Sequence, residues 1–350
     1  MVGSARPSQG LRTGLGVLAA IGVLFLVGRL SSVGPEPTAP DAEASAPARP
    51  LSSVLEFAEP IGGMVLNHAA MWVGHGTTVE ALDPQTLTVN ARVQLPAIAT
   101  AVRPGVARPL RGLATGARGD TIWASLANPA AGLLRIDTAS ARVEAVVPVA
   151  GVGPAAVSGA GGAAGVWVVC CGGETFLGPS RLVRVDARTN RVVAEVPLPG
   201  LPDAVGVGAS GVWVRGATGP VWRVDPVTNR VVATVAVPGG LGGIRGSVVV
   251  GRDAVWVSDP ASATVLRIDP GSNRIAARFR AAGSPLAVAA DGTLLATSGQ
   301  RVLGIGRGPV RSAQVDGLNG DYASAVVAAA DVIWVAESGA LFRVDRRALR

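Results

Sequence analysis

The chain has 350 residues, of which 49% are hydrophobic and 16% charged, and its net charge is +7. A chain of this length would suit about two domains, but a repeat described below favours a single closed ring. All 31 basic residues are arginine, which we attribute to a GC-rich coding sequence. The positive charge therefore does not indicate a nucleic-acid partner, and we expect none.

The N-terminal segment is predicted to be a membrane anchor. Residues 1–12 are polar and basic, and residues 13–28 carry no charge. This run is short for a transmembrane helix of about 20 residues and long for a signal-peptide core of roughly 7–15. We expect residues 1–12 to be cytoplasmic, residues 13–30 to form an apolar helix in the cell membrane, and the rest to lie outside. Cleavage as a signal peptide, giving a secreted protein, is the alternative. Residues 31–51, rich in Pro, Ala and Ser, are expected to be a linker.

Residues 211–238 contain a pattern that recurs through the rest of the chain. An apolar run is centred on Trp213, a second run ends at Asp225, and an alternating run begins at Arg230. Pro226 and Asn229 favour a tight hairpin turn after Asp225. Residues 203–208 are predicted as a further strand. Four short antiparallel strands cannot bury both faces of their sheet alone, so each copy needs neighbours.

The repeated Trp and Asp positions define seven copies. The Trp recurs as Trp72, Trp123, Trp167, Trp256 and Trp334, and the Asp as Asp83, Asp137, Asp186, Asp269 and Asp345. Leu295 and Gly306 replace them in one degenerate copy, so that the spacings are 51, 44, 46, 43, 39 and 39 residues. Such a period is typical of a β-propeller. We predict an all-β, monomeric, seven-bladed β-propeller of four-stranded antiparallel blades over residues 52–350, with the indoles between blades.

The two ends of this domain are expected to meet in one blade. The last copy ends soon after Asp345 and lacks its outer strand, whereas residues 52–59 form a spare strand before the first copy. Pairing of residues 52–59 beside Leu341–Asp345 would close the ring and remove two exposed edges.

Arginines recur with the repeat. They lie two residues before the Asp at Arg135, Arg184, Arg223, Arg267 and Arg343, and five residues after it, or after Gly306, at Arg142, Arg191, Arg230, Arg274, Arg311 and Arg350. Because they are spread around the ring, we expect them to pair with Asp and Glu between strands or blades.

Candidate ligand-binding residues lie on the rim that carries the loops after each Trp strand and the connections between blades. They are His75, Arg103, Arg215, Arg245, Asp259, Tyr322 and Glu337. Their chemistry is mixed and shows no convergence on a metal or phosphate site. We therefore expect no catalytic residue, no metal and no cofactor.

Cys170 and Cys171 open the longest of these loops. Outside the cytoplasm, a strained disulfide between the two adjacent residues is our first expectation. Free thiols are the main alternative, and a role in catalysis or ligand gating is the third.

The copies, with Val-Trp-Val followed by Arg-Val-Asp-Pro-x-Thr-Asn-Arg-Val-Val-Ala, resemble the YVTN-type and streptogramin-lyase-like β-propellers over about residues 54–350. The resemblance implies a non-catalytic binding or scaffolding module of the cell envelope, with a protein, peptide or glycan partner.

Streptogramin lyases use His and Glu residues with Mg²⁺, and this implies an alternative function. The chain has two histidines, His68 and His75, which we place at opposite ends of one strand, about 15–20 Å apart. They would then be too far apart to share a metal. An envelope lyase or hydrolase would use His75, Asp259, Glu337 and Tyr322, and these side chains would have to converge at the channel mouth.

Overall fold

The computed structural model describes residues 54–67, 70–97, 110–116, 118–126, 132–149, 157–159, 165–172, 178–237, 241, 246–281, 284–306, 308–318 and 323–349. The predicted N-terminal helix, anchor and linker lie outside these residues. Within them, no helix has the length and apolar character needed to cross a bilayer.

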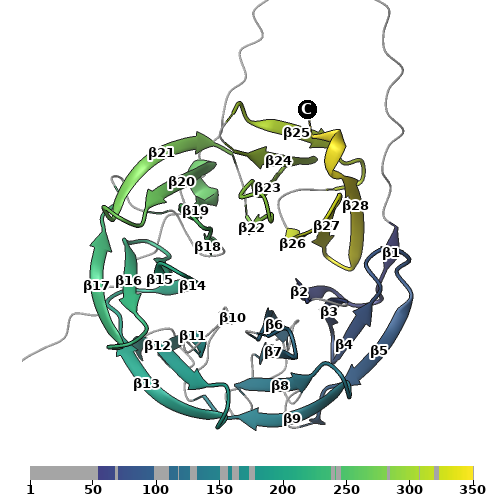
Figure 1. Ribbon diagram of the computed structural model, residues 1–350, viewed down its shortest axis with the longest axis horizontal. Coiled ribbons are helices and arrows are strands. Elements are labelled where there is room, and N and C mark those ends of the chain that lie inside the picture. Colours follow the sequence, from purple (N-terminus) through teal and green to yellow (C-terminus); the bar gives the residue numbers. More distant parts are fainter. Residues whose placement is uncertain are drawn as a thin grey trace, which may run out of the picture. The chain divides into compact units, whose positions relative to one another are not determined.

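The described strands form seven antiparallel sheets of four strands each, arranged as a ring (Figure 1), so the predicted all-β seven-bladed propeller is confirmed. Blade 1 comprises β2 (Ile61–Leu66), β3 (Met71–His75), β4 (Thr78–Leu82) and β5 (Val89–Gln94). Blade 2 comprises β6 (Leu110–Thr115), β7 (Thr121–Leu126), β8 (Leu133–Asp137) and β9 (Arg142–Val147). Blade 3 comprises β10 (Val157–Gly159), β11 (Val166–Gly172), β12 (Gly178–Asp186) and β13 (Arg191–Pro197).

The remaining blades follow the same order from the inner to the outer strand. Blade 4 comprises β14 (Pro202–Gly208), β15 (Gly211–Gly216), β16 (Val221–Asp225) and β17 (Arg230–Val235). Blade 5 comprises β18 (Val248–Val250), β19 (Val255–Asp259), β20 (Thr264–Asp269) and β21 (Arg274–Arg280). Blade 6 comprises β22 (Leu286–Val288), β23 (Leu294–Ser298), β24 (Arg301–Ile305) and β25 (Arg311–Gln314). Blade 7 comprises β26 (Ala323–Ala329), β27 (Val332–Glu337), β28 (Ala340–Asp345) and, from the other end of the domain, β1 (Leu55–Glu56).

The predicted closure of the ring is confirmed, with a shorter strand than expected. Leu55 pairs with Leu341 and Glu56 with Ala340 in an antiparallel register. The N–H of Phe57 donates to the carbonyl of Gly339 (2.7 Å), and that of Ile61 to the carbonyl of Ser338 (2.5 Å). The chain therefore follows β28 for two residues and then bends around the 338–339 loop into β2.

Each repeated Trp packs into the next blade, as predicted. Trp72 clusters with Leu113 and Ile122 of blade 2, and at the closure Trp334 clusters with Met64 and Met71 of blade 1. The six repeated indoles are 0–5% exposed. In blade 6, Leu295 takes the same place and packs against blade 7. Because side chains alternate along a strand, the neighbours of each Trp on its strand face the preceding blade, and both faces of every blade are covered.

In blades 2 to 4, the arginine two residues before the Asp also joins neighbouring blades, and its partners in the next blade are turn oxygens rather than acids. The Nη1 of Arg223 in blade 4 donates to the carbonyl of Pro270 (2.8 Å) and to Oδ1 of Asn273 (3.0 Å) in the turn of blade 5. Arg184 makes the same two bonds to Pro226 and Asn229 of blade 4. Arg135 makes them to Ala187 and Asn190 of blade 3. Within its own blade, Arg135 also pairs with an acid as predicted, its Nε lying 3.2 Å from Oε2 of Glu144 on the neighbouring strand.

The repeated Asp organises the turn that receives the arginine. The carboxylate of Asp225 accepts from the backbone N–H groups of Val227 (2.6 Å) and Thr228 (3.1 Å). Asn229 then adopts the left-handed conformation, with φ of 53°, in the tight turn predicted for it. The guanidinium of Arg223 also lies over the indole of Trp213, 5.4 Å from the ring centroid, so one arginine joins the core residue of its own blade to the turn of the next.

We predict that Trp213→Ala lowers the free energy of unfolding by about 3–5 kcal/mol, because it empties a fully buried site in the core between blades 4 and 5. Chemical denaturation followed by circular dichroism measures the change. Val227→Ala is the control, since Val227 is 84% exposed, and should change the free energy by less than about 0.5 kcal/mol. Equal effects of the two substitutions would refute the packing described here.

The turn aspartates predict a loss of stability in acid. The pKa of Asp225 is lowered because the backbone N–H groups of Thr228 and Val227 donate to its carboxylate. A depressed folded-state pKa gives stability that is complete above the unfolded value of about 3.9 and is lost as the pH falls through the folded value. The stability difference between the wild type and Asp225→Asn should therefore be constant above about pH 5 and narrow below about pH 4. Urea titrations from pH 7 to 2.5 measure it, and a difference independent of pH would contradict the prediction.

Candidate functional site

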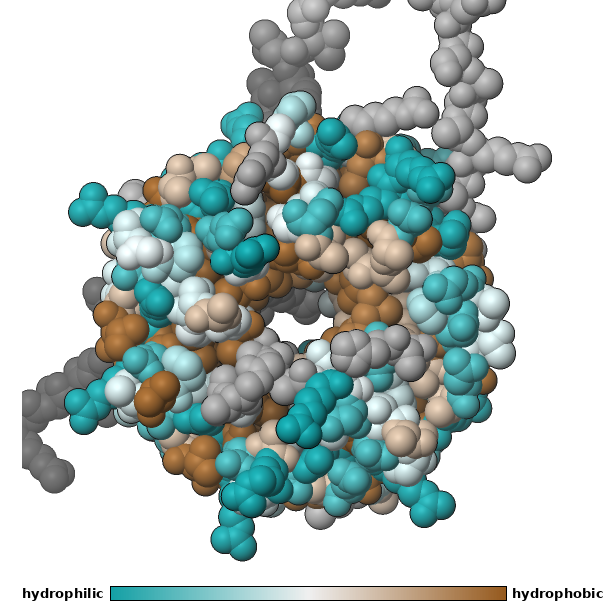
Figure 2. All heavy atoms as spheres, viewed as in Figure 1, coloured by the Kyte–Doolittle hydropathy of each residue, from teal (hydrophilic) through white to brown (hydrophobic). Residues whose placement is uncertain are grey.

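The ring has two rims. The connection rim carries the loops between the second and third strands of each blade and the connections between blades. The turn rim carries the loops between the first and second strands and between the third and fourth. Figure 2 shows an opening at the centre of the ring, with hydrophobic residues near it and hydrophilic residues projecting from the outer edge.

The structure describes four of the seven candidate residues, all at the connection-rim end of a second strand. His75 lies in β3, Arg215 in β15, Asp259 in β19 and Glu337 in β27. They belong to blades 1, 4, 5 and 7, so His75 and Glu337 lie on neighbouring blades, as do Arg215 and Asp259. The other three candidates, Arg103, Arg245 and Tyr322, lie outside the described residues, as does His68.

His75 lies beside the segment that closes the ring. Its ring packs against Phe57, with centroids 4.5 Å apart. Its Nε2 is 3.5 Å from Oε1 of Glu80, and its Nδ1 is 3.9 Å from Oε2 of Glu59. The Nη2 of Arg92 is 2.7 Å from the same Glu80 oxygen. The imidazole thus lies within a group of charges that joins β3, β4 and β5 to the segment following β1.

Arg215 is fully buried between blades 4 and 5. Its Nε donates to the carbonyl of Ser258 (2.9 Å), and its Nη1 forms an ion pair with Asp203. The backbone N–H of Gly246 also donates to Asp203 (3.3 Å). A Cβ on residue 246 would overlap the guanidinium, so the close approach of these two groups requires glycine. Arg215 and Asp203 both belong to blade 4, and their bonds to Ser258 and Gly246 join this pair to blade 5 and to the segment that leads into it.

A chain of polar contacts continues from Arg215 into blade 6. The hydroxyl of Ser258 accepts from the N–H of Ser247 (2.8 Å), and the Ser247 and Ser284 hydroxyls are 3.2 Å apart. The hydroxyl of Thr297 donates to the carbonyl of Ser284 (3.1 Å). The starts of the inner strands of blades 4, 5 and 6 are thereby joined by hydrogen bonds, which stiffen this part of the connection rim.

The two remaining acidic candidates are buried. Asp259 is 6% exposed, and its Oδ2 accepts from the hydroxyl of Ser262 (2.5 Å), in the short 3₁₀ helix η1 (Pro260–Ser262). Glu337 is 5% exposed at the end of β27. Among the residues that the structure describes, no three His, Cys, Asp or Glu side chains are grouped so that they could hold a metal ion.

The predicted bond between Cys170 and Cys171 is not tested. Cys170 is buried in the core between blades 2 and 3, with its Sγ 3.9 Å from the carbonyl oxygen of Val168. The side chain of Cys171 and the loop at 173–177 lie outside the described residues.

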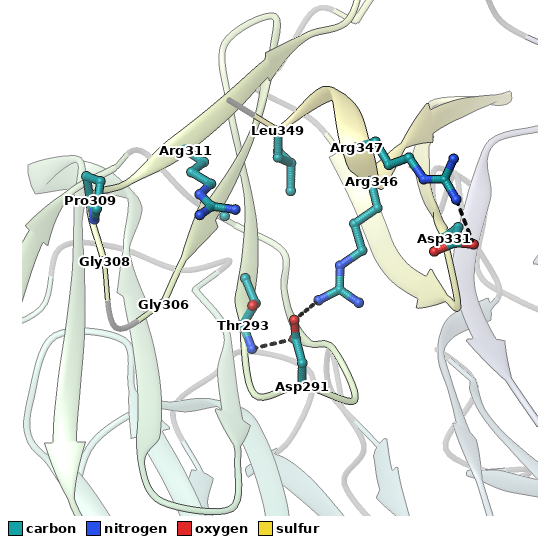
Figure 3. A pocket seen from close by; sticks show the side chains of 11 residues that line it. Asp291, Thr293, Gly306, Gly308, Pro309, Arg311, Asp331, Arg346, Arg347 and Leu349 are labelled. Carbon is teal, nitrogen blue, oxygen red and sulfur yellow. Dashed lines mark hydrogen bonds and ion pairs between the residues drawn. The ribbon is translucent and has the colours of Figure 1, made fainter.

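A pocket that the sequence did not lead us to expect lies on the turn rim between blades 6 and 7. Its volume is about 400 Å³, and Figure 3 shows the side chains that line it. They include Asp291 and Arg311 of blade 6 and Asp331, Arg346 and Leu349 of blade 7. The signal for it was present in the degenerate copy, where Gly304 and Gly306 replace the Arg and Asp of the other copies.

The fold is shared with known propellers. Virginiamycin B lyase from Staphylococcus aureus superimposes with a TM-score of 0.64 at 13% identity, covering 82% of this chain and 95% of the lyase. A catalytically inactive variant of that enzyme with quinupristin gives a TM-score of 0.65 at 14% identity, covering 83% and 97%. The Swd1 β-propeller domain of Myceliophteria thermophila gives 0.58 at 12% identity, covering 83% and 98%. No family model and no curated protein matches the chain. At these identities the likeness shows a shared β-propeller fold.

We predict that Arg215→Met lowers the free energy of unfolding by about 3–5 kcal/mol, because it leaves Asp203 without its guanidinium partner in a largely buried position. Adding Asp203→Asn should recover part of that loss. Denaturant titrations of both single variants and the double variant give the coupling energy. Arg230→Met, at an exposed position of β17, is the control. Strictly additive effects of the two substitutions would contradict a buried pair.

Proposed function

We propose that this chain is a non-catalytic binding module of the YVTN-like type. Residues 13–30 tether it to the cell membrane, and the connection rim of the propeller binds a protein, peptide or glycan outside the cytoplasm. No cofactor or metal is needed for this function.

One observation carries the proposal: the charged candidate residue Arg215 is taken up by contacts that join two blades. Arg215 is fully buried and bound by Asp203 and by the carbonyl of Ser258. This fully buried guanidinium reaches neither a ligand nor a substrate and instead links blades 4 and 5. The hydrogen-bonded framework of blades 4 to 6 instead gives a stiff surface, and a stiff surface loses little conformational entropy when a ligand binds.

An envelope lyase or hydrolase is the second candidate function. Two observations favour it: the lyases of Staphylococcus aureus share this fold, and His75 and Glu337 lie on neighbouring blades at the same rim. Against these observations, one fold serves many functions, so the shared architecture is a weak argument for a shared reaction. Asp259, the third described group that such an enzyme would need, lies on blade 5.

Binding and cleavage can be separated with the full-length chain in detergent. We expect that incubation with quinupristin, with or without Mg²⁺, leaves its chromatographic retention and its fragmentation in tandem mass spectrometry unchanged, since elimination within a ring would open it without changing its mass. We expect glycan and peptide arrays to identify a ligand that is retained intact. Cleavage of quinupristin that is lost in His75→Ala would instead establish the second candidate function.

Two matched charge reversals test where the ligand lies. Arg301→Glu changes the connection rim at the start of β24, and Arg188→Glu changes the turn rim between β12 and β13. The first should weaken binding of the ligand about tenfold or more, and the second should leave the affinity within about twofold. Equal effects would contradict a ligand on the connection rim.

Alkaline extraction of membranes from producing cells tests the tether, since an anchored chain stays with the membrane pellet.

A further inference from the structure

The pocket between blades 6 and 7 exists because the repeat is broken there. In blades 2, 3 and 4, an arginine of the third strand reaches the turn of the next blade. In blade 6, Gly304 holds that position and provides no side chain. The receiving turn has also changed. The C-terminal 3₁₀ helix η2 (Arg346–Ala348) replaces the hairpin turn, and Leu349 takes the place of the asparagine.

The register of blade 6 brings Arg311 into the space that the missing arginine leaves. In blades 2 to 5, the register shifts between the third and fourth strands, so that Arg230 lies opposite Asp225 and Arg274 opposite Asp269. Blade 6 has no such shift, and Arg311 lies opposite Gly304. Cross-strand partners point to the same face of a sheet. Arg311 therefore extends over the glycine, and Figure 3 shows its guanidinium turned into the pocket.

The charges that line the pocket are three arginines and two aspartates, Arg311, Arg346, Arg347, Asp291 and Asp331. Arg346 forms an ion pair with Asp291. The pKa of Asp291 is lowered to about 2, first by the backbone N–H of Thr293 and then by Arg346, so this carboxylate stays charged. Arg347 lies 3.9 Å from Asp331, with both side chains largely exposed. Within the described part of the chain, Arg311 makes no ion pair or side-chain hydrogen bond, so one positive charge in the pocket is uncompensated.

We propose that this pocket binds a small anionic molecule through a phosphate or carboxylate group. The guanidinium of Arg311 receives the anionic group, since the planar fork of an arginine matches both oxyanions. The ion pair with Asp291 fixes the side chain of Arg346, which forms another part of the pocket lining. A volume of about 400 Å³ lies within the usual range for small-molecule sites. The site is on the turn rim and is independent of the ligand proposed for the connection rim.

Isothermal titration calorimetry on the full-length chain in low-salt buffer tests the proposal with three probes: glucose 6-phosphate, glucuronate and glucose. We expect at least one of the two anions to bind and glucose to give no signal, and the preferred anion identifies the group. Binding of glucose as strong as that of the anions, or binding of neither anion, would overturn the proposal.

Two pairs of variants test the assignment to this pocket. Arg311→Gln should weaken binding of the anion about tenfold or more, whereas Arg274→Gln, at the same repeat position one blade away, should not.

Gly306→Asp restores the carboxylate of the repeat and should repel the anion, whereas the neutral Gly306→Asn should bind the anion more tightly than the Asp variant does. A Cβ at residue 306 meets nothing closer than 3.9 Å, so both variants should fold. Unchanged affinity in both Arg311→Gln and Gly306→Asp would place the anion elsewhere and refute the site.

Discussion

Every blade of this ring depends on burying the second strand of one sheet against the next sheet. An indole buries roughly 150–250 Å², and six of the seven interfaces contain one, from Trp72 to Trp334. An isolated four-stranded sheet would expose both apolar faces to water, so each blade needs a neighbour on each side. The pairing of β1 with β28 then gives the first and last blades the same support as the others. The rims carry the remaining differences between copies.

The sequence predicted the architecture well because core and turn positions must recur in every blade. The repeat alone assigns Trp213, Asp225 and Asn229 to core, turn and left-handed turn positions, and each has that role. The partners of the repeated arginines were predicted only in part: Arg135 pairs with Glu144 of the neighbouring strand, whereas the bonds between blades go to turn oxygens. A repeated arginine can donate hydrogen bonds to a carboxylate or to a carbonyl, and the sequence pattern does not distinguish the two. Only the packing of the blades shows that Arg223 donates to the carbonyl of Pro270.

The contacts around the candidate residues and the pocket could not be predicted, for two physical reasons. The rim residues His75, Arg215, Asp259 and Glu337 were placed by their register with Trp, which fixes the rim but not the contacts. Burial of Arg215 against the carbonyl of Ser258 depends on how two blades meet, and sequence spacing contains no information on that. The pocket at Arg311 arises from side chains that are missing at Gly304 and Gly306 and from a changed strand register, which becomes visible only against the regular blades.

Native-state hydrogen exchange of the second-strand amides, from β3 to β27, tests most directly the claim that no blade stands without its neighbours. If each blade depends on both neighbours, the slowest amides of all seven blades, including the degenerate blade 6, open with one common free energy equal to that of global unfolding. A blade whose second strand exchanges through its own, lower free energy of opening while the others stay protected would contradict that claim.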